Sequence, residues 1–138
     1  MVLDTDVIVA AMRSPTGASA AVLMAARHQL VTLLLTVPLA MEYEHSCKRL
    51  EHQLAAGLSL RQVDLFLDAI VAASEAVQSR FLWRPQLRDP DDEMVLEAAV
   101  NGRAKALVTF NIGDFGAAPS RFGIEVIRPG EVMRRLRQ

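Results

Sequence analysis

The residues LVTLLL at positions 30–35 form an aliphatic and β-branched run with the length of one strand. The run lacks the apolar–polar alternation of a half-buried strand, which indicates a strand that is buried on both faces. Strands of this kind occur where helices cover a parallel sheet on either side. The run therefore favours an α/β domain over an all-helical one.

Strand-like and helix-like segments alternate along the rest of the chain, which predicts an open, mostly parallel sheet covered by helices. Turn residues, capping residues and helical spacing set the expected boundaries. Thr5 is expected to cap the first helix. Strands are expected at 2–5, 30–35, 76–83, 104–110 and 122–129, and helices at 5–13, 18–29, 37–57, 59–74, 91–102 and 130–137.

Length, composition and charge bound the class of protein. With 138 residues, 51% of them hydrophobic, the chain fits one domain, 1–138, with a sizeable core. The sequence shows no apolar stretch of membrane-spanning length and no secretion signal, and its single cysteine, Cys47, fits a reducing compartment. We therefore expect a cytoplasmic protein that makes no membrane contact. The net charge of −1 argues against binding of nucleic acid through bulk positive potential.

Acidic residues gather where the expected strands and helices meet. Asp4 ends the first strand, and further acids stand at 42–44, at 91–93 and in TFNIGDF at 109–115. Because functional groups of parallel sheets collect beyond the carboxyl ends of the strands, these four segments can converge. Clustered carboxylates repel one another unless a cation lies among them. Mg²⁺ and Mn²⁺ prefer oxygen ligands and support phosphodiester hydrolysis by metal-activated water.

Each acidic segment also has a simpler interpretation. Asp4 could cap the following helix, and DPDDE at 89–93 has the cap, the proline and the acids of an ordinary helix N-terminus. Glu42 and Glu44 fit a solvated helix face, and the polar residues of 109–115 fit an ordinary loop. The joint placement of the four segments is what favours a metal site.

Several segments together resemble one known family. They are VLDTDVIVAAM, SPTGAS, VPLAMEYE, DPDDEMVLEAAVNG, AKALVTFNIGDF and GIEVIRPGEVMRRL. In this order they resemble PIN-domain proteins, specifically the branch described as toxins of toxin–antitoxin systems, which includes the VapC-like ribonucleases. The resemblance implies a three-layer α/β/α sandwich with a mostly parallel central sheet. It also implies an acidic pocket that holds Mg²⁺ or Mn²⁺ and metal-dependent cleavage of RNA.

The resemblance assigns roles to individual acids. The family's catalytic acids fall on Asp4, Glu42, Asp92 and Asp114. Asp4 and Asp92 would hold the principal metal ion, and Asp114 would complete or bridge the set of metal ligands. Glu42 would orient or deprotonate the attacking water. The register also allows Glu93 in place of Asp92.

Four further side chains near these acids would contact substrate or bound water. They are Thr5, Thr109, Asn111 and Glu93. Relatives often have an acid at the position of Asn111, so a second ion would bind weakly or only with RNA present. Asp6 is assigned to the start of its helix. The arginines at 80, 84 and 88 would position the RNA backbone.

Other functions remain open. The chain could be a PIN-like module that binds RNA or protein without cleaving it. DTDVI resembles the start of haloacid-dehalogenase-type phosphatases, but their lysine precedes the acidic pair, whereas Lys105 follows it here. The chain order suits a receiver-like phosphoacceptor domain poorly.

The expected partners come from the resemblance alone. They are an RNA substrate, a cognate antitoxin and a second copy of the chain in a homodimer. The apolar face of the helix at 60–73 fits either a packing surface for such a partner or a face buried in the core.

Overall fold

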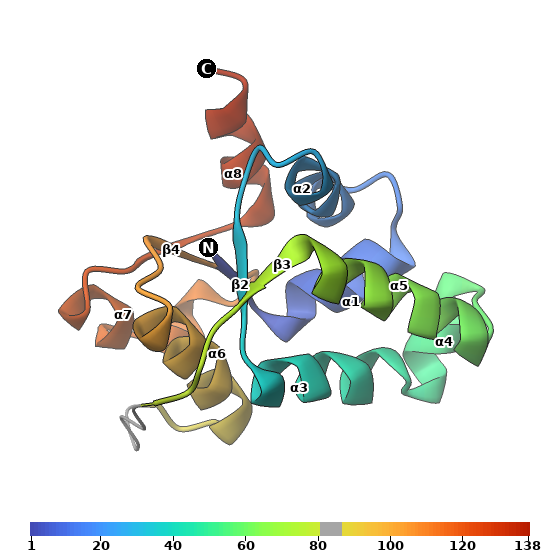
Figure 1. The fold of residues 1–138 in the computed structure, drawn as a ribbon, viewed down its shortest axis with the longest axis horizontal. Coiled ribbons are helices and arrows are strands. Elements are labelled where there is room, and N and C mark those ends of the chain that lie inside the picture. The colour runs from blue at the N-terminus through green and yellow to red at the C-terminus, as the bar shows by residue number, and fades with distance from the viewer. Residues whose placement is uncertain (81–86) are drawn as a thin grey trace.

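The strands run through the middle of the molecule, with helices on both sides (Figure 1). The computed structural model describes residues 1–80 and 87–138. In these residues the strands are β1 (Val2–Leu3), β2 (Leu33–Leu35), β3 (Ser74–Ala76), β4 (Ala106–Val108) and β5 (Glu125–Ile127). The helices are α1 (Thr5–Arg13), α2 (Ala18–Arg27), α3 (Val37–Cys47), α4 (Leu50–Ala56), α5 (Leu60–Ala73), α6 (Pro90–Asn101), the 3₁₀ helix η1 (Ile112–Phe115), α7 (Ala118–Arg121) and α8 (Pro129–Leu136).

The paired strands are all parallel. One sheet has the order β1-β4-β5, and β2 pairs with β3. The Leu34 amide donates to the Met1 carbonyl oxygen at 2.9 Å, which joins β2 to the residue before β1. The strands therefore follow one another as β3-β2-β1-β4-β5. β1 and β4 are central neighbours, and their carboxyl ends open at the same edge of the sheet.

Helices cover the strands from two sides, as the α/β/α prediction requires. In Figure 1, α1 and α3 to α5 lie on one side of the strands, and α6 and α7 lie on the other. α6 packs against β1, β2 and β4, while α1 packs against α2, α3 and α4. Leu3, Leu107 and Val108 of the central strands are buried. The mostly parallel sheet and the sandwich are thus confirmed.

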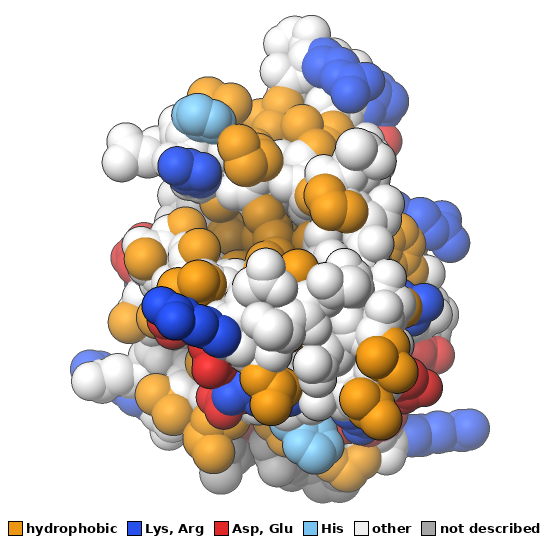
Figure 2. All heavy atoms as spheres, turned by 90° about the vertical axis from the view of Figure 1, so that its right-hand side faces the viewer, with side chains coloured by type: hydrophobic (Ala, Val, Ile, Leu, Met, Phe, Trp, Pro, Cys, Tyr) orange, Lys and Arg blue, Asp and Glu red, His pale blue; other side chains and the backbone are white. Residues whose placement is uncertain are grey.

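The apolar face of α5 is a core face. Ser59 caps the helix through a capping box with Gln62, and Val63, Leu67 and Ile70 are buried in the core. Burial of this stripe accounts for the helical spacing in the sequence. Figure 2 shows the side of the molecule that carries α4 and α5, where exposed hydrophobic side chains lie among charged ones.

Several predicted boundaries are wrong. The strand expected over 30–35 is only Leu33–Leu35, and Leu30 is 65% exposed, so the first half of the aliphatic run is not a buried strand.

Helix boundaries differ as well. Thr5 is the first residue of α1, and Asp4 is its N-cap, because Asp4 has an extended backbone and its carboxylate accepts from the Thr5 amide. The single helix expected over 37–57 is two helices, since Arg49 has an extended backbone at the start of α4. The break turns α4 so that it packs against α1.

The strand expected over 76–83 begins earlier than predicted. β3 covers Ser74–Ala76 and pairs with β2 in the register Leu33↔Ser74. The chain leaves α5 in extended form at Ser74, whose hydroxyl donates to the Ile70 carbonyl oxygen at 2.7 Å. Residues 77–80 form no strand, and 81–83 lie outside the described residues.

No single helix within residues 1–80 and 87–138 is long and apolar enough to cross a membrane. Of the helices in that part of the chain, only α1 and α2 taken together, with a bend of 99° between them, have the length and composition of a span.

Candidate active site

Asp4 lies where the central strand β1 becomes helix α1. Its amide donates to the Val108 carbonyl oxygen at 2.8 Å, which extends the pairing of β1 with β4. Its Oδ1 accepts from the Thr5 amide at 2.7 Å, and the residue is only 7% exposed. The capping interpretation is therefore correct for one carboxylate oxygen. The other oxygen faces the chain beyond β4.

Thr109 connects Asp4 to the loop after β4. The buried Thr109 hydroxyl donates to Asp4 Oδ2 at 2.7 Å and accepts from the Asn111 amide at 3.0 Å. Asp4 is thus held from both sides, by the first turn of α1 and by the residue that follows β4. The sequence instead predicted that Thr109 contacts substrate or bound water, and the role of holding Asp4 was missed.

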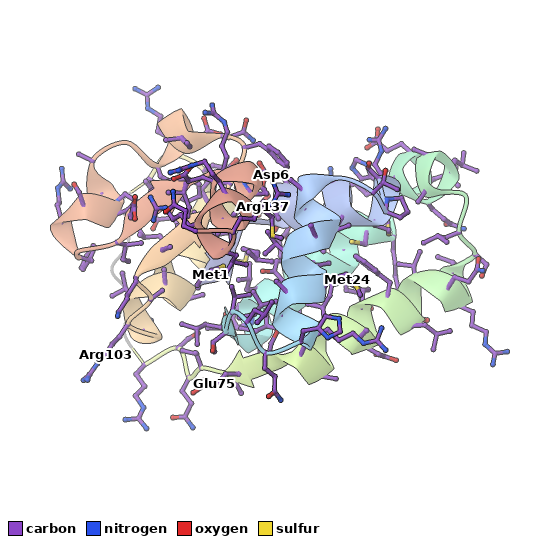
Figure 3. All side chains as sticks on the ribbon, turned by 90° about the horizontal axis from the view of Figure 1, so that it is seen from above. Met1, Asp6, Met24, Glu75, Arg103 and Arg137 are labelled. Atoms are coloured by element: carbon purple, nitrogen blue, oxygen red, sulfur yellow. The ribbon has the colours of Figure 1, made fainter. Side chains whose placement is uncertain are left out.

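Asp6 belongs to the same site, although sequence reasoning assigned it only to the start of its helix. It does lie in the first turn of α1. Its Oδ2 also accepts from the Phe110 amide at 3.1 Å and from Asn111 Nδ2 at 3.0 Å. Figure 3, which labels Asp6, shows it at the end of α1. The sequence signal for this role was the position of Asp6 two residues after Asp4.

Asp92 and Asp114 border a hollow next to these groups. The hollow has a volume of about 470 Å³, and its lining includes Asp92 from α6 and Asp114 from η1. Arg88 and Arg121 line it as well. Carboxylates and guanidinium groups thus share one concave surface, which suits a bound phosphate ester and a cation together.

Burial, and for Asp4 and Asp92 also repulsion by neighbouring carboxylates, raises the pKa values of three aspartates at this site. Burial, followed by the neighbouring Asp6 carboxylate, raises the pKa of Asp4 to about 7. Burial also raises the pKa of Asp6. The pKa of Asp92 rises to about 6 through burial and then through repulsion by Asp89 and Asp114. We call Asp4, Asp6, Asp92 and Asp114 the acid cluster.

Asp92 and Glu93 have different surroundings. The Glu93 side chain is buried, and its Oε1 accepts from the Leu87 amide at 2.7 Å, so it holds the segment before α6. The Asp92 side chain instead lines the hollow beside Asp114. This difference favours Asp92 as the third acid. Asp89 caps α6 by accepting from the Asp91 amide, as predicted for this segment.

Glu42 lies on α3, apart from the hollow. Its Oε1 accepts from Ser46 Oγ at 3.0 Å, one helical turn further on. Ser46 lines a second concave surface together with Thr5 and Asp6. The next residue, Tyr43, is buried and donates its hydroxyl to the Leu3 carbonyl oxygen. Among the described residues, Glu42 is therefore linked to this second surface only through Ser46, and its place among the catalytic acids stays a prediction.

The donor set fits a hard divalent cation. Asp6 Oδ1 is buried and has no hydrogen-bond partner within the described residues. In that same part of the chain, no three His, Cys, Asp or Glu side chains form a ready-made metal site. Mg²⁺ does not need one, because it usually keeps several waters and takes one or two carboxylates plus substrate phosphates.

The arginines expected near the site lie in different places. Arg88 lines the hollow. Arg80 lies further along the chain from β3, where its Nε donates to Gln78 Oε1 at 3.0 Å. Arg84 lies outside the described residues. Arg121, which sequence reasoning missed, reaches the hollow from α7, a helix too short to leave a periodic signal.

Replacing Thr109 by valine tests the support of Asp4. Valine preserves the volume but removes the donor to Asp4 and the acceptor for the Asn111 amide. We expect a loss of about 1 to 3 kcal/mol in the free energy of unfolding. Urea denaturation at pH 8 measures it, and an unchanged midpoint and slope would contradict the hydrogen-bond network.

Comparisons with known proteins identify the family and the fold of the chain. The chain matches the PIN domain family over residues 1–113. Its fold is similar to a chain in the crystal structure of VapBC2 from Rickettsia felis bound to a DNA fragment from their promoter, with a TM-score of 0.65 and 16% identity. The similarity covers 92% of this chain and 96% of that one. No curated protein matches significantly. The chain belongs to the PIN domain family.

Proposed function

We propose that this PIN-domain protein is a ribonuclease that depends on Mg²⁺ or Mn²⁺ and acts as the toxin of a toxin–antitoxin pair. The observation that carries the proposal is the acid cluster. Folding brings Asp4 and Asp92, 88 positions apart in the chain, close enough for Asp92 to raise the pKa of Asp4. A protein keeps such repelling carboxylates together where a cation offsets their charge.

The residues divide the work as follows. Asp4 and Asp92 would hold the principal ion, and Asp114 would complete or bridge the ligand set. A bound ion would supply a nucleophilic water at neutral pH and stabilise the charge on the phosphate. Thr109 fixes Asp4, while Glu42 would orient the water or accept its proton. Thr5 and Asn111 contact the scissile phosphate or waters beside it.

We propose RNA as the substrate because the family resemblance implies it, and the combination of cation ligands with guanidinium groups suits a phosphodiester backbone. Arg88 and Arg121 stand at the hollow that Asp92 and Asp114 line. Arginines there bind backbone phosphates, which fixes the position of the strand without reading its sequence.

The proposed partners rest on resemblance and not on a surface of this chain. The similar structure is that of VapBC2 bound to a DNA fragment from their promoter, and the sequence resembles toxins of toxin–antitoxin systems. We propose by analogy that a cognate antitoxin neutralises this chain and that two copies form a homodimer.

Metal-dependent cleavage of RNA tests the proposed function. The wild-type protein is expected to cut a mixed-sequence RNA in Mg²⁺ or Mn²⁺ and to stop when EDTA is added. Because the pKa of Asp4 is raised to about 7 and that of Asp92 to about 6, protons compete with the ion. The metal concentration needed for half-maximal activity should therefore fall as the pH rises from 5 to 8.

Two outcomes would contradict the proposal. An absence of cleavage at every pH and with both metals would leave a PIN module that only binds. Release of phosphate from small phosphate monoesters, without RNA cleavage, would identify a phosphatase instead.

A further inference from the structure

A groove runs from the acid cluster along one face of α1. Its floor is formed by residues 5–6, 9–10 and 13–14, which recur every four positions and so share a helix face. Ser46 of α3 and His52 of α4 form its wall. The groove has a volume of about 460 Å³, and we call it the α1 groove. Asp6 belongs to both the groove and the acid cluster.

The two ends of the α1 groove differ in charge. Asp6 lies at one end and Arg13 at the other, seven residues along the helix, which is about 10 Å at 1.5 Å per residue. Between them the floor is formed by the apolar side chains Val9 and Ala10. An apolar floor gains from covering the face of a nucleobase because both apolar surfaces leave water, and a guanidinium suits a backbone phosphate.

The guanidinium of Arg13 is held at the mouth of the groove. Its Nη1 donates to His52 Nδ1 at 3.3 Å, so His52 acts as the acceptor. The side of His52 that carries Nε2 faces Glu51, whose Oε1 is 3.9 Å away. Arg13 also lies in the last turn of α1, where a cation is favourable. Fixing this side chain before a ligand arrives reduces the entropy lost on binding.

We propose that the α1 groove binds the RNA segment next to the cleaved bond, with a base over Val9 and Ala10 and a backbone phosphate on Arg13. The proposal rests on the proposed ribonuclease function and adds a binding subsite to it. The strand would pass from Arg13 over Asp6 to the hollow with Arg88 and Arg121 on the other side of the acid cluster. Arg13 is then a positioning residue.

Measuring RNA affinity without cleavage tests the α1 groove independently of the ribonuclease proposal. We suggest measuring binding of a fluorescent eight-nucleotide oligouridine by anisotropy in Mg²⁺, with Asp4→Asn as the parent so that no cleavage occurs. Adding Arg13→Ala should raise the dissociation constant about tenfold, since a charge-assisted contact is lost. The plot of the logarithm of the association constant against the logarithm of the salt concentration has a negative slope. Its magnitude should become smaller by about 0.7, the value for one phosphate on a single strand.

Two further variants complete the test. Arg27→Ala is the matched control, because Arg27 is also an exposed arginine in the last turn of its helix, α2, but is not part of the groove lining. It should change affinity less than twofold. Ala10→Leu keeps a good helix former but fills the floor, so it should weaken binding as Arg13→Ala does.

Each result has a definite meaning for the groove. Equal affinities for the Arg13→Ala, Ala10→Leu and Arg27→Ala variants would overturn the proposal and leave the groove to a protein ligand. Weaker binding by the two groove variants would support it, even if the wild type proved unable to cleave RNA. In that case the ribonuclease proposal alone would fail.

Discussion

Asp4→Asn should make the metal-free protein more stable at pH 8 while it abolishes cleavage of RNA. The substitution removes a buried charge that Asp6 and Asp92 repel. Asparagine keeps an oxygen for the Thr5 amide, and its amide can donate to the Thr109 hydroxyl oxygen. We expect a gain of about 2 to 4 kcal/mol in the free energy of unfolding at pH 8, from a pKa raised by about three units.

The size of this effect depends on pH. Burial raises the pKa of Asp4 from its ordinary value of 3.8 to about 7 in the folded protein. Well below pH 4 the carboxyl is protonated in both states, so the folded protein bears no cost of ionisation. Between about pH 4 and pH 7 the unfolded state ionises this carboxyl while the folded state keeps it protonated, so stability falls as the pH rises. Above about pH 7 both states are ionised and the full cost remains. The advantage of Asp4→Asn should therefore vanish near pH 4.

Denaturation in urea with EDTA, at pH 4 and pH 8, measures the change in stability. Asp68→Asn serves as a control because Asp68 is exposed on α5, and it should leave stability nearly unchanged. Cleavage by Asp4→Asn should fall by about a thousandfold or more, since a metal ligand is lost. A destabilised variant at pH 8, or one that cuts RNA at the wild-type rate, would contradict the assignment of Asp4.

Much of the fold follows from local signals in the sequence. The aliphatic run at 30–35 and the alternation of elements predicted the parallel sheet, and the helix expected to begin at residue 59 is α5, with Ser59 as its cap. Gly102 ends α6 as predicted. Its φ of −84° is an ordinary right-handed value, so a left-handed backbone is not the reason for the glycine. A Cβ there would lie 2.9 Å from both the Ala98 carbonyl oxygen and Leu34 Cδ1, so packing requires the glycine.

The features that sequence reasoning missed depend on distant contacts. The break between α3 and α4 has no proline or glycine to mark it, and α4 packs against α1. Asp6 looks like a helix-start residue until the loop at 109–111 folds over it. Arg121 reaches the hollow only because α7 turns back towards α6. A strand-to-helix pattern can place Asp4, but it cannot show which side chains reach it across the sheet.

Asp92→Asn should abolish most of the activity, whereas Glu93→Gln should leave most of it in place. Both changes replace a carboxylate by an amide of the same shape, so they differ mainly in where the charge is lost. Asp92 lines the hollow with Asp114, whereas Glu93 is buried and accepts from the Leu87 amide, a bond that glutamine can also accept. We expect Asp92→Asn to lower kcat by about a thousandfold, as for loss of a metal ligand.

The Glu93→Gln variant should keep most of the wild-type kcat per folded molecule, and its main defect should be a lower free energy of unfolding. Asp91→Asn is the matched control, since Asp91 is the exposed neighbour in the same helical turn. Metal-dependent cleavage rates, normalised to the folded fraction from circular dichroism, compare the three variants. If Glu93→Gln lost activity and Asp92→Asn kept it, the third metal ligand would be Glu93, because only a carboxylate that holds the ion is sensitive to loss of its charge in a folded site.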